Sequence, residues 1–383
     1  MASALDGIKV LDLSNYIAGP YAAMLLGDQG AEIIKLERPG GDPYRTAPGF
    51  AVWNRGKRSI TADLTKKDGQ QVARELAARA DILLHSFRPG VPERLGVGYE
   101  ALKELNPRLI YISITGWGEK GPFRDKPGYE PLIAAFGGAY IVQGSAENPT
   151  YTVLPYPSYF TALLVPYYAV TALLVRKITG RGQKIEMPLL NGILEAASNS
   201  IVDFPGVLRV PRSPLGTLPV YRLFKTADDW LFLGIGNVTF WARFALLLGH
   251  EEWLTDPRFE GAPWAVAPEH RQVLVDMVSH VLAAKSRDEW IALFRENDIP
   301  ASPVLTVEEF LGDPQVLANK MVVELDDPVL GKTRQMGIGV TMPLTPGRIK
   351  GPAPTAGQHT DEVLGALGYS VNGIAQLKAN GTV

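Results

Sequence analysis

The chain has 383 residues, of which 46% are hydrophobic and 20% charged, with a formal net charge of -2. This balance is typical of a globular protein with room for two domains, and it gives no electrostatic reason to expect nucleic acid or a membrane as a partner. Cysteine is absent, which excludes disulfides, thiolate metal sites and a cysteine nucleophile. Because no secretory signal pattern precedes the first predicted strand, we expect a cytoplasmic protein.

Strands and helices alternate over the first 115 residues. Apolar runs predict strands at 8–13, 32–36, 81–87 and 109–114. Helical spacing of apolar residues lies between them, at 21–29, 69–80 and 99–105. Repeated strand–helix–strand units with near-continuous apolar strands predict a parallel sheet with helices on both faces.

An uncharged apolar segment occupies residues 159–175. Its 17 residues are near the lower limit for crossing a membrane. It contains Pro166 and ends in Arg176 and Lys177. We therefore predict a buried core helix with a proline kink rather than a membrane span.

The pattern changes after a proline-bearing connector at 205–219. A strand at 231–235 and helices at 241–248, 271–284 and 287–296 predict a separate α+β unit. The C-terminal section from Met342 is rich in proline and glycine and ends in a predicted helix at 360–367.

Short cofactor and metal motifs are missing. Gly234-Ile-Gly236 lacks the third glycine of a dinucleotide fingerprint. The five histidines show no pairing at i and i+4 and no carboxylate at ligand spacing. We therefore predict no metal and no nucleotide redox cofactor. These patterns alone indicate a two-domain α/β enzyme.

Longer motifs extend along the whole chain. In order they are Gly7-Ile-Lys-Val-Leu-Asp-Leu13, Ala18-Gly-Pro20, Leu26-Gly-Asp-Gln-Gly-Ala31, Asn54-Arg-Gly-Lys-Arg-Ser59, Phe87-Arg-Pro-Gly-Val-Pro-Glu-Arg-Leu-Gly96, Thr115-Gly-Trp-Gly118, Pro127-Gly-Tyr-Glu130, Thr179-Gly-Arg-Gly-Gln183 and Gly357-Gln-His-Thr-Asp-Glu-Val-Leu364. Together they resemble family III of the coenzyme A-transferases, the formyl-CoA/carnitine CoA-transferase family, which also includes α-methylacyl-CoA racemases.

The resemblance implies a Rossmann-like large domain built from both chain ends, a smaller α+β domain and an interlinked dimer. It places the large CoA-binding domain at 1–205 and 346–383, the small domain at 225–325, and connectors at 206–224 and 326–345. Coenzyme A or acyl-CoA is then a substrate, and CoA moves from an acyl-CoA donor to a carboxylic acid.

Matching motif positions imply a set of residues around CoA. They are Ile17, Ala18, Arg38, Ala62, Leu64, Thr65, Ser86, Phe87, Arg88, Arg94 and Lys126. Guanidinium groups suit the phosphates of CoA, because they donate paired hydrogen bonds to oxyanions. Phe87 fits equally well as a core residue or as a platform for adenine.

The family's nucleophilic aspartate falls on Ser158. In the family a carboxylate attacks the donor thioester, and the resulting anhydride is reopened by CoA thiolate because carboxylate is a good leaving group. A serine ester would leave a far more basic alkoxide, and no general base is visible nearby. We therefore predict that Ser158 is catalytically inactive and caps the following helix.

Two neighbouring positions complete the predicted site. Glu130 matches an active-site carboxylate of the family, and Tyr129 lies beside it. In the related racemases a histidine at the Tyr129 position and the aspartate at the Ser158 position form the acid–base pair. This chain has neither residue. Because a racemase needs two proton-transfer groups, their absence weakens the racemase hypothesis more than the transferase hypothesis.

Three hypotheses remain. The chain is a self-sufficient transferase that uses Glu130 or carries an engineered serine, a CoA-binding but catalytically degenerate subunit paired with an active homologue, or a CoA-thioester racemase, isomerase or lyase. We favour the second, because Pro155, Pro157 and Tyr159 flank the serine and indicate natural divergence. The partners are then acyl-CoA, a carboxylic acid and a homologous subunit in a homodimer or heterodimer, without nucleic acid or membrane.

Overall fold

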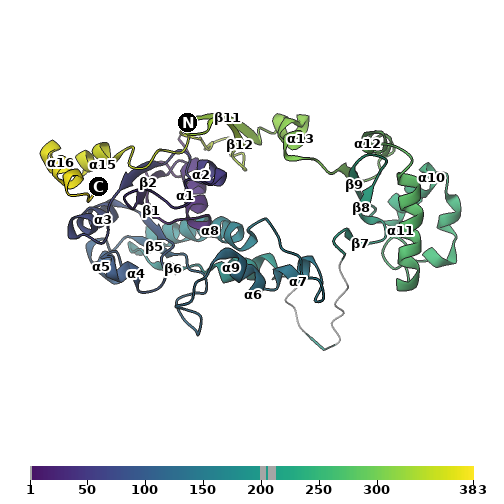
Figure 1. Cartoon of the computed structure of the whole chain (residues 1–383), viewed down its shortest axis with the longest axis horizontal. Coiled ribbons are helices and arrows are strands. Elements are labelled where there is room, and N and C mark those ends of the chain that lie inside the picture. Colours follow the sequence, from purple (N-terminus) through teal and green to yellow (C-terminus); the bar gives the residue numbers. More distant parts are fainter. Residues whose placement is uncertain (1, 199–203, 206–212) are drawn as a thin grey trace. The chain divides into compact units, whose positions relative to one another are not determined.

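The computed structural model describes residues 2–198, 204–205 and 213–383, which fall into two compact units (Figure 1). One unit comprises Met1–Ala139, Val153–Asp203 and Pro314–Val383, and the other comprises Tyr140–Thr152 and Phe204–Asp313. The predicted fold class is confirmed: a large α/β unit draws on both ends of the chain, and a smaller unit combines helices with an antiparallel sheet.

A six-stranded parallel sheet organises the first unit. Its strands, in spatial order, are β3 (Arg58–Thr61), β2 (Glu32–Glu37), β1 (Lys9–Leu13), β4 (Ile82–His85), β5 (Ile110–Ser113) and β6 (Lys184–Glu186). The chain moves outward from β1 to β3 and then returns to β4 on the other side of β1. The loops after β1 and β4 therefore flank the point where the strand order reverses, which is where open α/β sheets bind ligands.

Helices cover both faces of this sheet (Figure 1). The helices of the first unit are α1 (Ala18–Asp28), α2 (Pro48–Trp53), α3 (Lys67–Arg79), α4 (Val91–Arg94), α5 (Tyr99–Leu105), α6 (Glu130–Phe136), α8 (Tyr156–Thr179), α9 (Leu189–Ala196), α14 (Pro314–Ala318), α15 (Thr360–Leu367) and α16 (Val371–Ala379). A further short helix, α7 (Ala139–Gln143), lies at the boundary between the units.

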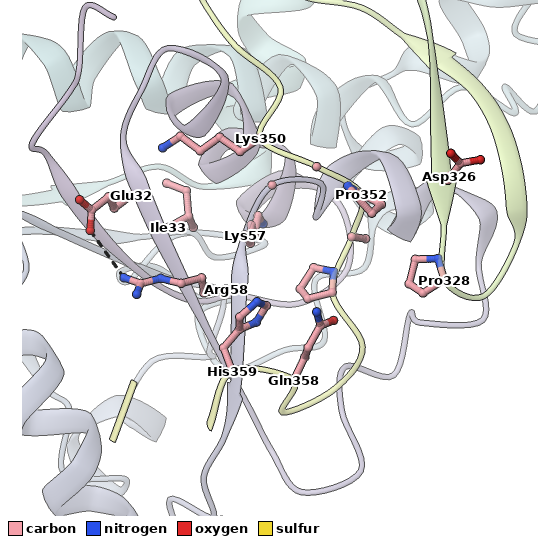
Figure 2. Close-up of a pocket in the computed structure, with 14 residues that line it drawn as sticks. Glu32, Ile33, Lys57, Arg58, Asp326, Pro328, Lys350, Pro352, Gln358 and His359 are labelled. Carbon is pink, nitrogen blue, oxygen red and sulfur yellow. Dashed lines mark ion pairs between the residues drawn. The ribbon is translucent and has the colours of Figure 1, made fainter. Parts of the chain in front are cut away.

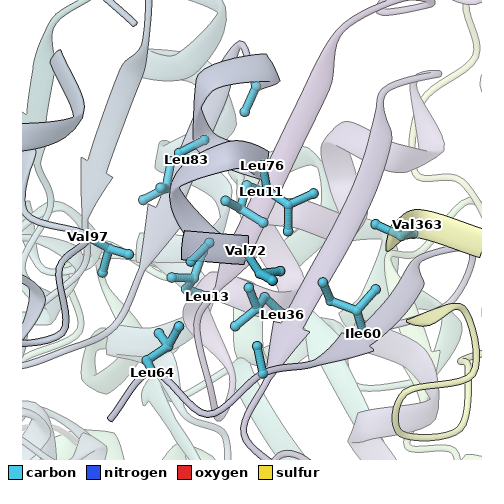
Figure 3. Packing of buried hydrophobic residues seen from close by; sticks show 14 of the residues in the cluster. Leu11, Leu13, Leu36, Ile60, Leu64, Val72, Leu76, Leu83, Val97 and Val363 are labelled. Carbon is cyan, nitrogen blue, oxygen red and sulfur yellow. The ribbon is translucent and has the colours of Figure 1, made fainter. Parts of the chain in front are cut away.

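Two apolar clusters fill the layers between sheet and helices. Figure 3 shows the first, where Leu11 and Leu13 of β1 pack with Val72 of α3 and Val363 of α15. Val10 of β1 faces the opposite cluster, together with residues of α1 and α8. Alternate residues of one strand thus serve opposite faces, as the two-residue period of a strand requires.

Helix α8 differs from the predicted fully buried core helix. Val165, Ala169 and Ala172 lie in the core, but only 33% of the most apolar window of this helix is buried. The other face exposes apolar side chains three or four residues apart: Leu163, Tyr167, Val170, Leu174 and Ile178. The helix is long and apolar enough to cross a membrane by length and composition, yet one of its faces packs within the α/β unit.

A β-hairpin occupies the segment for which a connector at 326–345 was predicted. Strands β11 (Val322–Asp327) and β12 (Gly331–Met336) pair in antiparallel fashion. Arg55 anchors the hairpin, because its guanidinium donates to the carbonyl oxygens of Met336 and Gly337 while it pairs with Asp28 at 2.6 Å. The sequence concealed this hairpin because its residues are mostly polar or exposed and carry weak periodicity.

The second unit contains its own sheet and core. The strands run in the order β10 (Ala301–Pro303), β9 (Trp230–Gly234), β8 (Tyr221–Lys225) and β7 (Gly216–Leu218), all antiparallel. Among its described residues, the helices that accompany them include α10 (Val238–Leu247), α11 (Pro268–Leu282), α12 (Arg287–Glu296) and α13 (Val307–Gly312), with 3-10 turns at Glu251–Leu254 and Pro257–Phe259. Trp241, Phe244, Trp253 and Phe294 contribute large rings to the core.

Candidate active site

The loops after β1 and β4 are joined at the reversal of the strand order. The backbone N–H of Asn15 donates to the Ser86 hydroxyl at 2.9 Å. Ile17 and Ala18, both buried, follow in the β1 loop and start α1. Ser86, Ile17 and Ala18 of the predicted CoA set therefore lie in two linked loops, at the edge where open α/β sheets bind ligands.

The other predicted CoA residues lie in segments that follow strands of the sheet, and they differ in exposure. Arg38 follows β2 and is exposed, with its Nε donating to the Gly41 carbonyl at 3.2 Å. Residues 62–65 follow β3, and there Ala62 and Leu64 are buried while Thr65 is exposed. The remaining cations, Arg88, Arg94 and Lys126, are all exposed.

Phe87 is half-buried, and its ring makes contacts of the kind expected for a core residue. Its ring stacks on His85 with centroids 5.5 Å apart and packs against the core. The Phe87 backbone N–H donates to Nδ1 of His85. Burial lowers the pKa of His85 to about 3, so this imidazole is neutral and serves as a hydrogen-bond acceptor.

A buried network of charges lies at the carboxyl ends of β1 and β2. Lys57 donates to Asp12 at 2.8 Å, and Lys35 pairs with Asp42 at 3.0 Å, with all four side chains fully buried. Glu37 accepts two hydrogen bonds from Arg45. The Asn54-Arg-Gly-Lys-Arg-Ser59 motif, matched in sequence to the family, supplies Lys57 to this network.

The network also orders the β1 loop. Asp12 accepts hydrogen bonds from the backbone N–H and the hydroxyl of Ser14, and Lys35 donates to the Ser14 carbonyl at 2.8 Å. Ser14 lies two residues before Tyr16, whose backbone has φ +67°. A left-handed conformation is strained for such a bulky residue and is typical of functional loops.

Glu130 and Ser158 meet although they are 28 positions apart in sequence. The Glu130 carboxylate accepts, at Oε2, the Ser158 backbone N–H at 3.0 Å and the Ser158 hydroxyl at 2.8 Å. Glu130 begins α6, and Ser158 is the third residue of α8. The carboxylate therefore lies at the amino end of α8, where free N–H groups and the helix dipole favour negative charge.

The predicted capping role of Ser158 is wrong. Helix α8 begins at Tyr156, two residues earlier than Ser158 itself, and Pro155 at the N-cap position makes no side-chain capping bond. Instead the Glu130 carboxylate, from another helix, takes up the N–H of Ser158. Proline is favoured in the first turn of a helix, which explains why Pro157 did not delay the start of α8.

Opposing effects set the protonation of Glu130. Burial raises the pKa of its carboxyl above the ordinary value, and the hydrogen bonds from the hydroxyl and the backbone of Ser158 act in the opposite direction. Burial has the larger effect, so the net direction is upward. A raised pKa means that the carboxylate is more basic than an ordinary glutamate, which makes it a stronger nucleophile once it is ionised.

Two glycines fix the backbone that carries Tyr129 and Glu130. A Cβ added to Gly128 would lie 2.6 Å from the Gly116 Cα, so the two chains touch backbone to backbone. Trp117 Nε1 donates to the Pro127 carbonyl at 3.0 Å across the same contact. The Thr115-Gly-Trp-Gly and Pro127-Gly-Tyr-Glu motifs thus act as one unit that positions Glu130.

Aromatic rings lie beside this pair: the predicted site residue Tyr129, the Ser158 neighbour Tyr159, and three rings that the sequence did not single out. Tyr129, Tyr16, Tyr44, Trp53 and Tyr159 contact one another in that order, with centroids 6.4, 5.6, 6.1 and 6.4 Å apart. Tyr129 directly precedes Glu130, and Tyr159 directly follows Ser158. No sequence pattern relates these positions, because they come from separate loops and helices.

A cavity of about 640 Å³ lies elsewhere, at the amino ends of β2 and β3 (Figure 2). Segments 350–354 and 358–359 line it together with Asp326 and Pro328. Arg58 in its wall pairs with Glu32 at 3.5 Å, shown by the dashed line. The lining includes no predicted CoA or catalytic residue, so the candidate active site is at the opposite edge of the sheet. Among the described residues, no cluster of histidine and acidic side chains suits a metal ion.

Comparison with known proteins identifies the family of the chain. The sequence profile of CoA-transferase family III matches residues 5–360. A succinyl-CoA–D-citramalate CoA-transferase of Chloroflexus aurantiacus is 32% identical over 98% of this chain and 97% of its own. The beta subunit of a succinyl-CoA–L-malate CoA-transferase from the same organism is 33% identical over 94% of this chain and 93% of its own.

A solved structure matches the fold over nearly the whole chain. The crystal structure of a CAIB/BAIF family protein from Brucella suis has a TM-score of 0.86 and 28% sequence identity, covering 96% of this chain and 100% of that one. The sequence resemblance, the profile and the relatives agree. The chain belongs to CoA-transferase family III.

Proposed function

We propose that this protein transfers CoA from an acyl-CoA donor to a carboxylic acid, with Glu130 as the attacking carboxylate. One observation carries the proposal: the Glu130 carboxylate is bound by the N–H and hydroxyl of Ser158, the position of the family's aspartate. A carboxylate therefore lies at the amino end of α8 even though the aspartate is absent. This favours the self-sufficient enzyme over the degenerate subunit that the sequence alone led us to prefer.

The proposed reaction uses the free oxygen of Glu130. In the first step the carboxylate attacks the donor thioester carbonyl, forming a mixed anhydride and releasing CoA thiolate. The thiolate then attacks the Glu130 carbonyl, giving an enzyme thioester and the donor carboxylate. The acceptor carboxylate displaces CoA by the same route, and the thiolate finally opens the new anhydride and restores Glu130. Each leaving group is a carboxylate or a thiolate, so no strongly basic alkoxide forms.

Ser158 orients this carboxylate and does not attack. Its two hydrogen bonds converge on Oε2, which leaves Oε1 to approach the thioester. The same donors stabilise negative charge on Glu130 when it leaves the anhydride. The predicted CoA residues, from Ile17 and Ala18 to Lys126, are proposed to hold the nucleotide and phosphates along the carboxyl edge of the sheet.

A second candidate function is a CoA-binding subunit that works with a catalytic homologue. The beta-subunit name of one relative supports it, and so does the exposed apolar face of α8, defined by Leu163, Tyr167, Val170, Leu174 and Ile178. An exposed apolar stripe of this length suits a protein interface. The predicted interlinked dimer, of identical or homologous chains, would cover it.

The names of the two relatives mention citramalate and malate, which are dicarboxylates.

Trapping the enzyme thioester tests the proposal. The purified protein is incubated with acyl-CoA thioesters of different chain types, treated with hydroxylamine, and mapped by peptide mass spectrometry. We expect a hydroxamate on Glu130 in the wild type, none in E130Q, and an unchanged yield in E195Q, which alters a glutamate of α9 outside the site. The amide oxygen introduced by E130Q can still accept both Ser158 hydrogen bonds, so this variant is expected to fold.

Native mass spectrometry separates the two candidates. Transfer by a homomer with a hydroxamate on Glu130 supports the self-sufficient enzyme. Transfer that appears only with a co-expressed homologue, with the hydroxamate on that partner, overturns it in favour of the non-catalytic subunit.

A further inference from the structure

The aromatic rings around Glu130 form a chain that is closed by the catalytic pair. The five rings run from Tyr129 through Tyr16, Tyr44 and Trp53 to Tyr159. The two ends adjoin Glu130 and Ser158, which bond to each other at 2.8 Å. Burial, followed by Tyr21, Tyr44 and Glu130, raises the pKa of the Tyr159 hydroxyl.

These rings do not simply fill a core. Tyr16 is 44% exposed and Tyr129 is 59% exposed, while Tyr44, Trp53 and Tyr159 are half-buried. Four ring contacts in succession, mostly edge to face, leave a continuous aromatic surface beside the carboxylate. The backbone of Tyr16 adopts the strained left-handed conformation, and strain of this kind clusters at functional sites.

Three cations of the buried charge network are already neutralised. Lys57 pairs with Asp12, and Lys35 pairs with Asp42. Arg45 pairs with Glu37 at 2.5 Å and covers the Phe50 ring. None of these three is left to bind a second carboxylate, and the further cations Arg38 and Lys126 belong to the predicted CoA set. The five rings therefore offer aromatic faces, and the tyrosines among them hydroxyls, to an acyl chain at Glu130.

We infer that the acyl group handled at Glu130 is an aromatic monocarboxylic acid, held against the Tyr16–Tyr44–Trp53 rings. Offset and edge-to-face contacts between rings favour an aryl group over an alkyl chain of similar size. A terminal carboxylate at the same place would lose hydration without gaining a cation. This inference rests on the proposed function, because it assumes that the thioester is presented to Glu130.

Binding of matched thioesters to the E130Q protein tests the inference without any turnover. The probes are 3-phenylpropanoyl-CoA and glutaryl-CoA, which share the CoA part, and their dissociation constants are measured by isothermal titration calorimetry. We expect the aryl thioester to bind at least about tenfold more tightly, since burying one aromatic ring is worth that much. Equal binding, tighter binding of glutaryl-CoA, or no binding of the aryl thioester overturns the inference.

The ratio of the two dissociation constants, measured for each variant, tests whether the rings cause the aryl preference. W53L in the E130Q background is expected to lower the preference by about fivefold, and F310L, an exposed ring of α13, is expected to leave it unchanged. A variant that fails to fold loses both ligands, whereas a variant that loses only the aryl contact still binds glutaryl-CoA. Y44F, which keeps the ring, is expected to retain the preference. An unchanged ratio in W53L contradicts the assignment.

The two proposals can fail separately. If the aryl preference holds but the wild type transfers no CoA, the proposed function fails and the binding assignment stands. If the wild type transfers glutaryl groups through Glu130 and binds them more tightly, the function stands and the substrate class is wrong.

Discussion

Replacing Lys57 by methionine should strongly destabilise the α/β unit. Lys57 Nζ donates to Asp12 at 2.8 Å, to the Pro20 carbonyl at 2.9 Å and to Asn54 at 2.9 Å. Burial lowers the pKa of Lys57 to about 8, although Asp12 opposes the shift, so the ammonium remains charged at pH 7. Burial alone would raise the pKa of Asp12, but Lys57 and Lys35 hold it below the ordinary value.

The magnitude follows from what K57M leaves behind. Asp12 keeps its bonds from Ser14 but loses the cation that offsets its burial. Removing one partner of a buried ion pair costs roughly 3–5 kcal/mol. For a unit of this size each kcal/mol lowers the melting temperature by about 2–4 °C, so we expect a fall of about 10 °C.

Differential scanning fluorimetry and calorimetry measure this effect against a matched control. R58M removes the adjacent cation, whose pair with Glu32 is partly exposed, and should cost less than about 1 kcal/mol. The double variant D12N/K57M removes the orphaned charge and should recover part of the loss. If K57M melts within about 2 °C of R58M, or if the double variant shows no recovery, the pair between Lys57 and Asp12 does not stabilise the unit in this way.

Three further predictions concern the site and its surroundings. Because burial raises the pKa of Glu130, the rate of CoA transfer should rise with pH through an apparent pKa above that of an ordinary glutamate. S158A removes one of the two Ser158 hydrogen bonds that lower this pKa, so the rising part of its rate-versus-pH profile should move to higher pH. An unmoved profile in S158A would argue against Glu130. G128A brings a Cβ within 2.6 Å of the Gly116 backbone, so thioester trapping at Glu130 should fall at least about tenfold while CoA binding measured by calorimetry is retained. In the folded protein the pKa of His85 is lowered from 6.5 to about 3. Its contribution to stability is therefore fully present above pH 6.5 and is lost as the pH falls toward about 3. In urea titrations over that pH range, the free energy of unfolding should fall less steeply in H85N than in the wild type.

The fold was predictable because its signals are local. The strands around Val10, Ile34, Leu84 and Ile112 are short apolar runs between helical patterns, and a parallel sheet follows from their alternation. The hairpin β11–β12 escaped prediction because its residues are mostly partly or fully exposed. The apolar outer face of α8 was taken for core, since hydrophobicity alone does not distinguish a core face from an exposed interface.

The site was only half predictable, for a different reason. Motif matching singled out Glu130 and Ser158, but it left them as separate positions on separate helices. Their contact depends on where α8 begins and on the close approach of Gly116 and Gly128, which are tertiary facts. The rings of Tyr16, Tyr44 and Trp53 carry no motif, so their common surface appears only once their separate segments have been brought together.

If Glu130 is the nucleophile, as proposed, the geometry accounts for a serine at the position that the family resemblance assigns to an aspartate. Two carboxylates at the amino end of α8 would repel each other and would share a proton, because like charges this close do not both ionise. With Ser158, the single carboxylate of Glu130 keeps both hydrogen-bond donors of that residue. Glu130 of α6 thus supplies the negative charge at the amino end of α8. A hydroxyl that fails as a nucleophile, because its alkoxide leaves poorly, is well suited to hold a neighbouring carboxylate that does not.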